Sequence, residues 1–293
     1  MIIWLASYPK SGNTLVRSIL SSLIYSKDGN FNFNLLEKID QYPQKKHFKG
    51  MTDKFDKLLE LSKFWIFSQD KLNEDKKLKF LKTHHLRCGI NNYTFTNKNN
   101  TAGVIYIVRD PRDVVISYAE HSSNEIKDCA IDMMTSDNCI FTNKNLISLL
   151  GSWSDHYNSW TKNNKNLLLI KYEDLLSNKK KEIIKIINFV NTFVNTSISD
   201  EKINNCLNTT TFENMQSMEE KGLFTENNID EKMNGKIKFF NTGKKNEWKN
   251  ILDYKIRTEI EKKFKNEMSE LKYILLCRFI HRTKKFIIIF SSL

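Results

Sequence analysis

The chain has 293 residues, of which 40% are hydrophobic and 19 are Phe, and this composition argues against intrinsic disorder. Its 46 Lys and Arg exceed its 34 Asp and Glu, which gives a formal net charge of +12. The lysines are spread from Lys10 to Lys285 with no dense basic block among aromatic residues, so the charge indicates a solvated surface that steers an anionic ligand more than a nucleic-acid-binding protein.

Cysteine usage and the start of the chain bear on the compartment. The cysteines are five in number, and no Cys-x-x-Cys or Cys/His spacing joins them; they are Cys88, Cys129, Cys139, Cys206 and Cys277. This pattern predicts neither a disulfide framework nor a metal site, and it favours a reducing, cytoplasmic location. Residues 2–6 lack the charged start and the long apolar stretch of a signal peptide.

Four short apolar runs have the composition of buried β-strands: residues 2–6, 79–83, 104–108 and 167–171. Helical patterns follow three of them, over residues 14–25, 112–121 and 179–193. Alternation of strands and helices indicates right-handed βαβ units. The sequence therefore predicts a three-layer α/β/α fold with a central parallel sheet, like that of the P-loop NTPases.

Two further helical patterns cover residues 55–67 and residues 253–273. Without an internal repeat or a Pro/Gly-rich linker, we expect a single domain over residues 1–275. Residues 276–293 form a tail of apolar runs interrupted by basic residues, which excludes a span across a bilayer. We expect a docked terminal helix there, with peripheral membrane contact through the tail as the alternative.

The segment between the first strand and the first helix carries the strongest local pattern, Tyr-Pro-Lys-Ser-Gly-Asn-Thr over residues 8–14. Pro9 fixes φ and Gly12 permits a tight turn, after which the free N–H groups of a helix start favour an anion. Lys10 adds a positive charge, and Ser11 and Thr14 add hydroxyls. The segment predicts a phosphate cradle, although it lacks the spacing of the Walker motif.

A second pattern follows the strand at residues 104–108, where Arg109 stands at the carboxyl end and Ser117 lies two turns into the next helix. Open α/β sheets bind ligands at this edge, and a planar guanidinium with a hydroxyl suits a phosphate group. The alternative is that Arg109 forms an ion pair with Asp110 or Asp113.

Together these segments resemble the sulfotransferases that use 3′-phosphoadenosine 5′-phosphosulfate (PAPS). The donor loop of that family reads close to YPKSGTTW, from which Asn13 and Leu15 depart, and its 3′-phosphate motif has an Arg and a Ser separated by seven residues. The resemblance implies in-line transfer of a sulfuryl group from PAPS to a hydroxyl or amine of an unidentified acceptor. The product from the donor would be 3′,5′-bisphosphoadenosine.

The resemblance also implies roles for individual residues. Lys-Thr-His at residues 82–84 matches the family segment that makes His84 the catalytic base, with Lys82 and Lys10 beside the transferring group. His85 is the alternative base if the strand bends. The residues implied for donor binding are Lys10, Ser11, Gly12, Asn13, Thr14, Arg109, Ser117, Tyr172, Phe212, Gly243 and Lys244.

The family's last motif is degraded in this chain. Asn241 and Thr242 stand where the family has a basic pair that closes on the 3′-phosphate, so Lys244 and Lys245, on the other side of Gly243, are the candidate substitutes. Core packing is the alternative role for Phe212.

Two other function classes remain as alternatives: a P-loop kinase of small molecules, and a non-catalytic basic protein that binds nucleic acid or membrane. The first requires a Walker lysine and a carboxylate for Mg²⁺, which the spacing does not provide. The acceptor stays open between small molecule, carbohydrate and lipid, because residues 26–78, 122–166 and 195–250 carry no acceptor motif. The sequence does not predict an oligomeric state.

Overall fold

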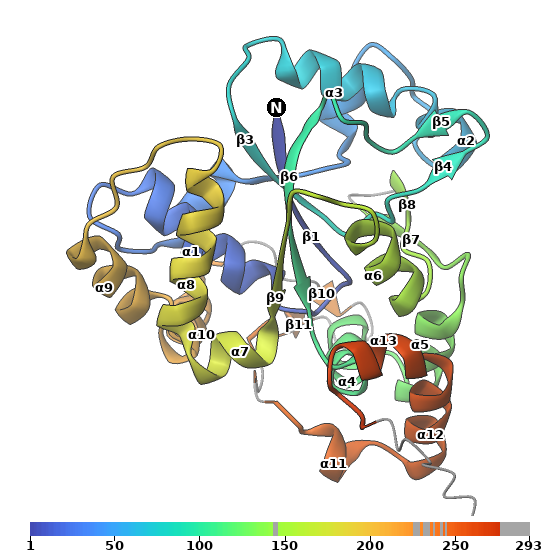
Figure 1. Ribbon diagram of the computed structural model, residues 1–293. Coiled ribbons are helices and arrows are strands. Elements are labelled where there is room, and N and C mark those ends of the chain that lie inside the picture. The colour runs from blue at the N-terminus through green and yellow to red at the C-terminus, as the bar shows by residue number, and fades with distance from the viewer. Residues whose placement is uncertain are drawn as a thin grey trace, which may run out of the picture.

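The computed structural model of the chain describes residues 1–142, 146–224, 229–230, 235–236, 238–240, 243 and 245–275. A central sheet of five parallel strands has the order β2-β3-β1-β6-β9 (Figure 1). These strands are β1 (Ile2–Ser7), β2 (Asp40–Gln41), β3 (Lys79–Thr83), β6 (Thr101–Val108) and β9 (Leu167–Lys171). The four predicted strands are confirmed, and β2 is an edge strand too short to give a pattern in the sequence.

Helices cover both faces of this sheet, which confirms the three-layer α/β/α prediction (Figure 1). One layer contains α1 (Asn13–Tyr25), α8 (Lys179–Asn191), α9 (Asp200–Thr209) and α10 (Phe212–Glu220). The other contains α4 (Pro111–Ser122), α5 (Ile126–Met134), α6 (Trp153–Thr161) and α12 (Tyr254–Lys263). Strand β1 contributes side chains to the hydrophobic cores on both faces of the sheet. Ile3 and Leu5 pack in the core on the α1 side, and Trp4 and Ala6 pack in the core of the opposite layer.

The remaining elements are short. They are η1 (Phe33–Lys38), η2 (Lys45–Phe48), α2 (Leu58–Ser62), α3 (Trp65–Asn73), α7 (Tyr172–Ser177), α11 (Trp248–Ile251), α13 (Lys265–Glu270) and the strand pairs β4 (Gly89–Ile90) with β5 (Tyr93–Thr94), β7 (Cys139–Thr142) with β8 (Leu146–Leu149), and β10 (Ile229–Asp230) with β11 (Gly235–Lys236). In the part of the chain that the structure describes, no helix is long and apolar enough to cross a membrane.

Two predicted helices are each divided in the structure. The pattern over residues 55–67 becomes α2 and α3, and the pattern over residues 253–273 becomes α12 and α13 with a break at Phe264. Phe264 is fully buried against Trp153, and its backbone leaves the helical region. Ile260, Phe264 and Met268 belong to one core cluster, and their four-residue spacing is the same on a continuous helix, so periodicity alone does not reveal the break. The predicted tail, residues 276–293, lies outside the described residues.

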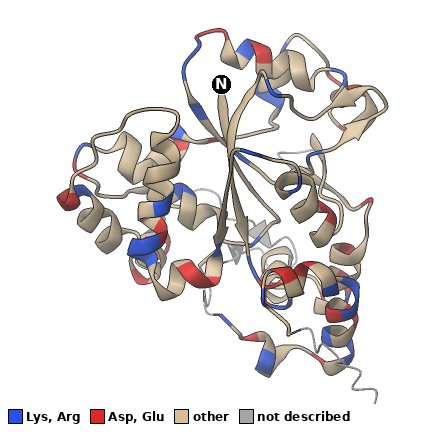
Figure 2. Ribbon diagram, in the orientation of Figure 1, with Lys and Arg blue, Asp and Glu red and all other residues tan. Residues whose placement is uncertain are grey.

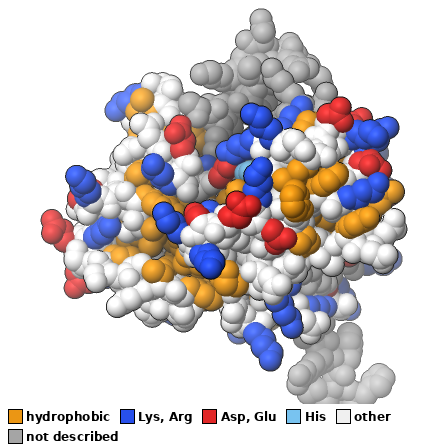
Figure 3. Space-filling view, turned by 90° about the horizontal axis from the view of Figure 1, so that it is seen from above, with side chains coloured by type: hydrophobic (Ala, Val, Ile, Leu, Met, Phe, Trp, Pro, Cys, Tyr) orange, Lys and Arg blue, Asp and Glu red, His pale blue; other side chains and the backbone are white. Residues whose placement is uncertain are grey.

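Basic side chains are distributed over helices of both layers and over loops, instead of forming one stripe (Figure 2). On the face seen from above, basic, acidic and hydrophobic side chains are intermixed (Figure 3). A dispersed charge of this kind keeps a protein solvated and raises the local concentration of anions without specifying a nucleic-acid groove.

Candidate functional site

A cavity of about 1260 Å³ opens at the carboxyl ends of the parallel strands. Parallel strands all end at one edge of a sheet, so the segments that follow them meet there. Of the predicted site residues, those that line the cavity are Lys10, Gly12, Asn13, Thr14, Lys82, His84, Arg109, Ser117, Tyr172, Phe212 and Gly243. Ser11 is buried and is not part of the cavity lining, and Lys244 lies outside the described residues, together with Asn241 and Thr242.

The turn before α1 requires glycine for two reasons. Gly12 has φ +97°, and a Cβ atom there would lie 2.5 Å from Cδ2 of Tyr172. The first helical hydrogen bond runs from Val16 N–H to the Gly12 carbonyl, so the N–H groups of residues 13–15, which line the cavity, have no carbonyl partner within the helix. Within the described residues, the buried Ser11 hydroxyl has no hydrogen-bond partner. These donors form a cradle for an anion.

Three cations converge on this cradle from three strands. Burial, and then the charges of Arg109 and Lys82, lower the pKa of Lys10 to about 7. The Lys10 ammonium lies 3.9 Å from the centre of the Phe239 ring. The Arg109 guanidinium lies 4.6 Å from the centre of the Tyr172 ring and donates to the Lys10 carbonyl at 3.2 Å. An anionic ligand would relieve this mutual repulsion.

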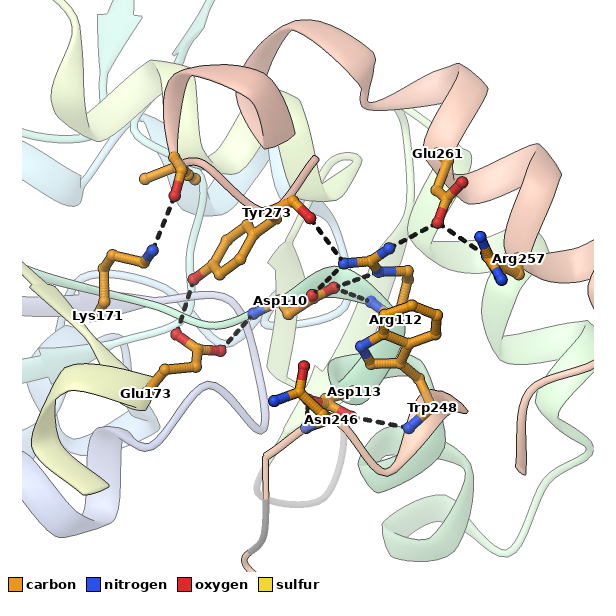
Figure 4. Close-up of polar contacts among 11 residues, drawn as sticks. Asp110, Arg112, Asp113, Lys171, Glu173, Asn246, Trp248, Arg257, Glu261 and Tyr273 are labelled. Atoms are coloured by element: carbon orange, nitrogen blue, oxygen red, sulfur yellow. Dashed lines mark hydrogen bonds and ion pairs between the residues drawn. The ribbon is translucent and has the colours of Figure 1, made fainter. Parts of the chain in front are cut away.

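The carboxylates next to Arg109 in the sequence have other partners (Figure 4). Asp110 pairs with Arg112 at 2.6 Å, and Asp113 accepts backbone hydrogen bonds from Asn246 at 2.7 Å and Trp248 at 3.0 Å. Asp113 thereby ties the segment after Gly243 to α4. Arg109 itself lines the cavity, and its charge partly offsets the burial that raises the pKa of Asp113.

Arg112 is the centre of a clamp that ties the C-terminal helices to the start of α4 (Figure 4). Its guanidinium also donates to Glu261 at 2.6 Å and to the Tyr273 carbonyl at 3.0 Å, and it stacks 3.7 Å from the centre of the Trp248 ring. Glu173 joins the same clamp, because it accepts from the Asp110 N–H and the Tyr273 hydroxyl, both at 2.9 Å. The clamp therefore supports the loop that carries Arg109.

His84 and Lys82 lie at the end of β3 and point to the cavity. The Nδ1 atom of His84 is 2.7 Å from the Ser7 carbonyl oxygen, which can only accept, so Nδ1 carries the proton and Nε2 keeps its lone pair. Burial and then the charge of Lys82 hold the pKa of His84 well below its ordinary value. The ring is consequently neutral near pH 7 and can accept a proton.

Two neighbouring histidines, His85 and His156, are buried in the protein core. His85 is 1% exposed, stacks at 4.4 Å between ring centres on Phe95, and does not belong to the cavity lining. His156 is fully buried, and its Nε2 donates to the His84 carbonyl at 3.1 Å. The strand does not bend in the way that the alternative role of His85 requires.

A wall of the cavity is made by Tyr172, Phe212 and Gly243. The Tyr172 hydroxyl donates to the Gly243 carbonyl at 2.6 Å. Gly243 has φ +61°, and a Cβ atom there would lie 2.3 Å from Cε2 of Phe212. Phe212 lines the cavity and also packs at 6.1 Å from Phe240, so its ring serves both the cavity and the core.

Sequence reasoning missed the other half of the cavity. Gln41 pairs with Lys82 in the register of β2 and β3, and His121 stands one turn after Ser117 on α4. Burial, then Lys10 and Lys82, lower the pKa of His121 to about 3, which places its ring beside the two cations. The four-residue spacing from Ser117 is a signal in the sequence that identifies His121 as a neighbour. Within the described ranges, no cluster of His, Cys, Asp or Glu side chains is arranged to hold a metal ion.

Comparisons with known proteins agree with this geometry. A sequence profile described as the sulfotransferase domain matches residues 2–272. The amine sulfotransferase of Oryctolagus cuniculus is 28% identical over 183 residues, which cover 60% of this chain and 58% of the relative. Sulfotransferase 1E1 of Bos taurus is 25% identical over 283 residues, which cover 92% of this chain and 84% of the relative.

Two solved structures have the same fold. Mouse sulfotransferase SULT7A1 complexed with PAP is 21% identical and gives a TM-score of 0.57, over 91% of this chain and 84% of the other. A retinol dehydratase in a complex with retinol and PAP is 19% identical and gives a TM-score of 0.59, over 92% of this chain and 81% of the other.

Replacing Gly12 with alanine tests the cradle. The new Cβ meets the Tyr172 ring at 2.5 Å, so the loop must shift and the affinity for 3′,5′-bisphosphoadenosine should fall roughly 10-fold or more. Gly50→Ala is the matched control, since Gly50 has φ +77° but nothing within 4 Å of its Cβ position. Thermal-shift titration measures both. Equal affinities in the two variants would contradict a cradle at Gly12.

Proposed function

The chain belongs to the sulfotransferase family, and we propose that it moves a sulfuryl group from PAPS to a hydroxyl or amine of a small-molecule acceptor. One observation supports this proposal most strongly: three groups of residues, each suited to a different part of the reaction, line one cavity. They are the cradle at residues 8–14, the pair Arg109 and Ser117, and the pair Lys82 and His84.

PAPS is proposed as the donor because the cavity offers two places for phosphate. The cradle and Lys10 suit the 5′-phosphosulfate, and Arg109 with Ser117 suits a 3′-phosphate. Both solved structures reported above contain PAP, which is consistent with this donor. ATP has no 3′-phosphate, so it would leave a partly desolvated arginine without its anion.

The proposed transfer is in line. The acceptor oxygen or nitrogen attacks sulfur while His84 Nε2 takes its proton, and the bond between sulfur and the bridging oxygen of the phosphosulfate breaks. The electron pair of that bond leaves with 3′,5′-bisphosphoadenosine. Lys10, Lys82 and the N–H groups of the cradle stabilise the departing oxygen, as positioned cations do in phosphoryl transfer.

The part of the cavity left for the acceptor has a mixed lining. Beyond His84 it includes the polar side chains of Gln41, Gln44, His121 and Asn124 and the largely apolar side chains of Tyr118, Ile140 and Phe141. Such a lining suits an acceptor that carries hydrogen-bonding groups beside an apolar part. One relative is named an amine sulfotransferase, which keeps an amine among the candidate acceptors.

A cytoplasmic location is part of the proposal. The described cysteines are all free thiols, namely Cys88, Cys129, Cys139 and Cys206. Free thiols persist in a reducing compartment.

Nucleotide selectivity tests the donor. 3′,5′-Bisphosphoadenosine should raise the melting temperature, whereas ATP with Mg²⁺ and AMP should bind at least tenfold more weakly because neither reaches Arg109 with a phosphate. Arg109→Gln should remove most of the preference over AMP. Lys262→Gln, an equal loss of charge at an exposed position of α12, should leave it intact. Equal protection by ATP and by the bisphosphate would contradict the proposed donor.

Transfer itself is tested with ³⁵S-labelled PAPS and a panel of amines, sugars, phenols and lipid alcohols. The label should move to a polar hydroxyl or amine acceptor, and His84→Ala should lower turnover about 10²–10⁴-fold because the base is lost. His85→Ala should retain the nucleotide preference and far more turnover, since His85 lies off the cavity. Near-normal turnover in His84→Ala would refute the assigned base.

The pH dependence of donor binding tests Lys10. Its pKa of about 7 means that the charged form prevails below pH 7 and the neutral form above it. A phosphate binds the charged form, so affinity should begin to fall as the pH approaches 7 and should fall by up to about tenfold per pH unit above it, with proton uptake on binding. Calorimetry in buffers of different ionisation enthalpy measures this uptake. The Lys10→Arg substitution should abolish the proton uptake, because arginine stays charged. A wild-type affinity that does not change between pH 7 and pH 9 would contradict the role of Lys10.

A further inference from the structure

We propose that Ser7 and Asn13 are positioning residues for His84, and that they bond the donor loop to the catalytic base. The inference rests on the proposed function, because it presupposes that His84 accepts the acceptor's proton. It begins from a chain of contacts that runs from α1 through β1 to the end of β3. Ser7 is the last residue of β1 and is fully buried, and Asn13 is the first residue of α1 and is 4% exposed.

Ser7 presents two oxygens to one ring nitrogen. His84 Nδ1 lies 2.7 Å from the Ser7 carbonyl oxygen and 3.3 Å from its hydroxyl oxygen. An unprotonated Nδ1 would face the carbonyl lone pairs at that distance, which is repulsive, so the tautomer with the proton on Nδ1 is selected. Selection of this tautomer leaves the Nε2 lone pair for the acceptor's proton.

Asn13 holds the Ser7 hydroxyl in place. Its Nδ2 donates to the Leu5 carbonyl at 3.0 Å and to Ser7 Oγ at 3.1 Å. A carbonyl can only accept, so the contact with Leu5 fixes which end of the amide faces β1. The Asn13 side chain therefore serves the base, and only its backbone N–H belongs to the anion cradle. This refines the donor-binding role expected for Asn13 from the sequence.

The contacts gain strength when His84 becomes charged. Proton transfer turns the ring into a cation, which burial and the charge of Lys82 both disfavour. The Nδ1–H bonds to Ser7 are then charge-assisted, so the Ser7 oxygens stabilise the ring in the transition state more than in the ground state. Loss of the hydroxyl should lower turnover and spare donor affinity.

The test compares Ser7→Ala, Asn13→Ala and the double variant, with turnover and bisphosphate affinity measured separately. Each single variant should lower kcat about 10-fold to 100-fold, with affinity for 3′,5′-bisphosphoadenosine within about twofold of wild type, because a hydrogen bond to a charged group is lost. The double variant should lose no more than the larger single loss if Asn13 acts through Ser7. Ser21→Ala is the control, a fully buried hydroxyl of α1 that bonds only the Ser18 carbonyl.

The His84→Ala background separates this inference from the proposed function. In that background Ser7→Ala should have no further effect on the residual rate, whereas an undiminished loss would overturn the positioning role. Normal turnover in His84→Ala alone would instead overturn the base. If Ser7→Ala yields no folded protein, as judged by absent bisphosphate protection, Asn13→Ala in the same two backgrounds decides the question. A double variant whose loss of turnover equals the sum of the two single losses would also overturn the inference that Asn13 acts through Ser7.

Discussion

The site depends on holding three mutually repelling cations at one edge of a sheet. Lys10, Lys82 and Arg109 follow or end three adjacent strands, and the low pKa of Lys10 records the cost of bringing them together out of water. The protein offsets part of this cost with aromatic faces, Phe239 beneath Lys10 and Tyr172 beneath Arg109. The remaining unfavourable energy is available to any ligand that brings negative charge, which makes the site selective for anions before any specific contact forms.

A rigid frame is needed to keep such a cluster from relaxing into solvent. The clamp around Arg112 supplies this frame. Arg112, on α4, bonds Asp110 before the helix, Glu261 on α12 and the Tyr273 carbonyl after α13. Glu173 connects α7 to the same clamp, because it accepts hydrogen bonds from the Asp110 N–H and the Tyr273 hydroxyl. Arg109 stands one residue before this frame, so its direction is set by interactions that never touch the ligand.

Much of the fold was predictable because its four long strands are continuous apolar runs. The turn at residues 8–14, between β1 and α1 at the cavity, was predictable because Pro9 and Gly12 mark the end of a strand and a tight turn. The partners of adjacent charges were not predictable, since Asp110 and Asp113 follow Arg109 by one and four residues and only the packing of Arg112 and Trp248 determines what each carboxylate contacts. The same holds for β2, whose two residues leave no periodicity yet carry Gln41 to the side of Lys82. Ser7 was invisible as a contributor, because its main part in the site is a backbone carbonyl.

Helix α4 has one further property. Asp113, Ser117 and His121 recur every four residues, so a single face of this helix touches the segment after Gly243 and then two successive parts of the cavity wall. With a rise of about 1.5 Å per residue, these three side chains are spaced roughly 6 Å apart along the helix axis. A substitution at one of these positions changes only the contacts of that side chain. An insertion or deletion of one residue would rotate all later side chains by about 100° around the helix axis, so this stretch of the chain should tolerate changes of side chain far better than changes of length.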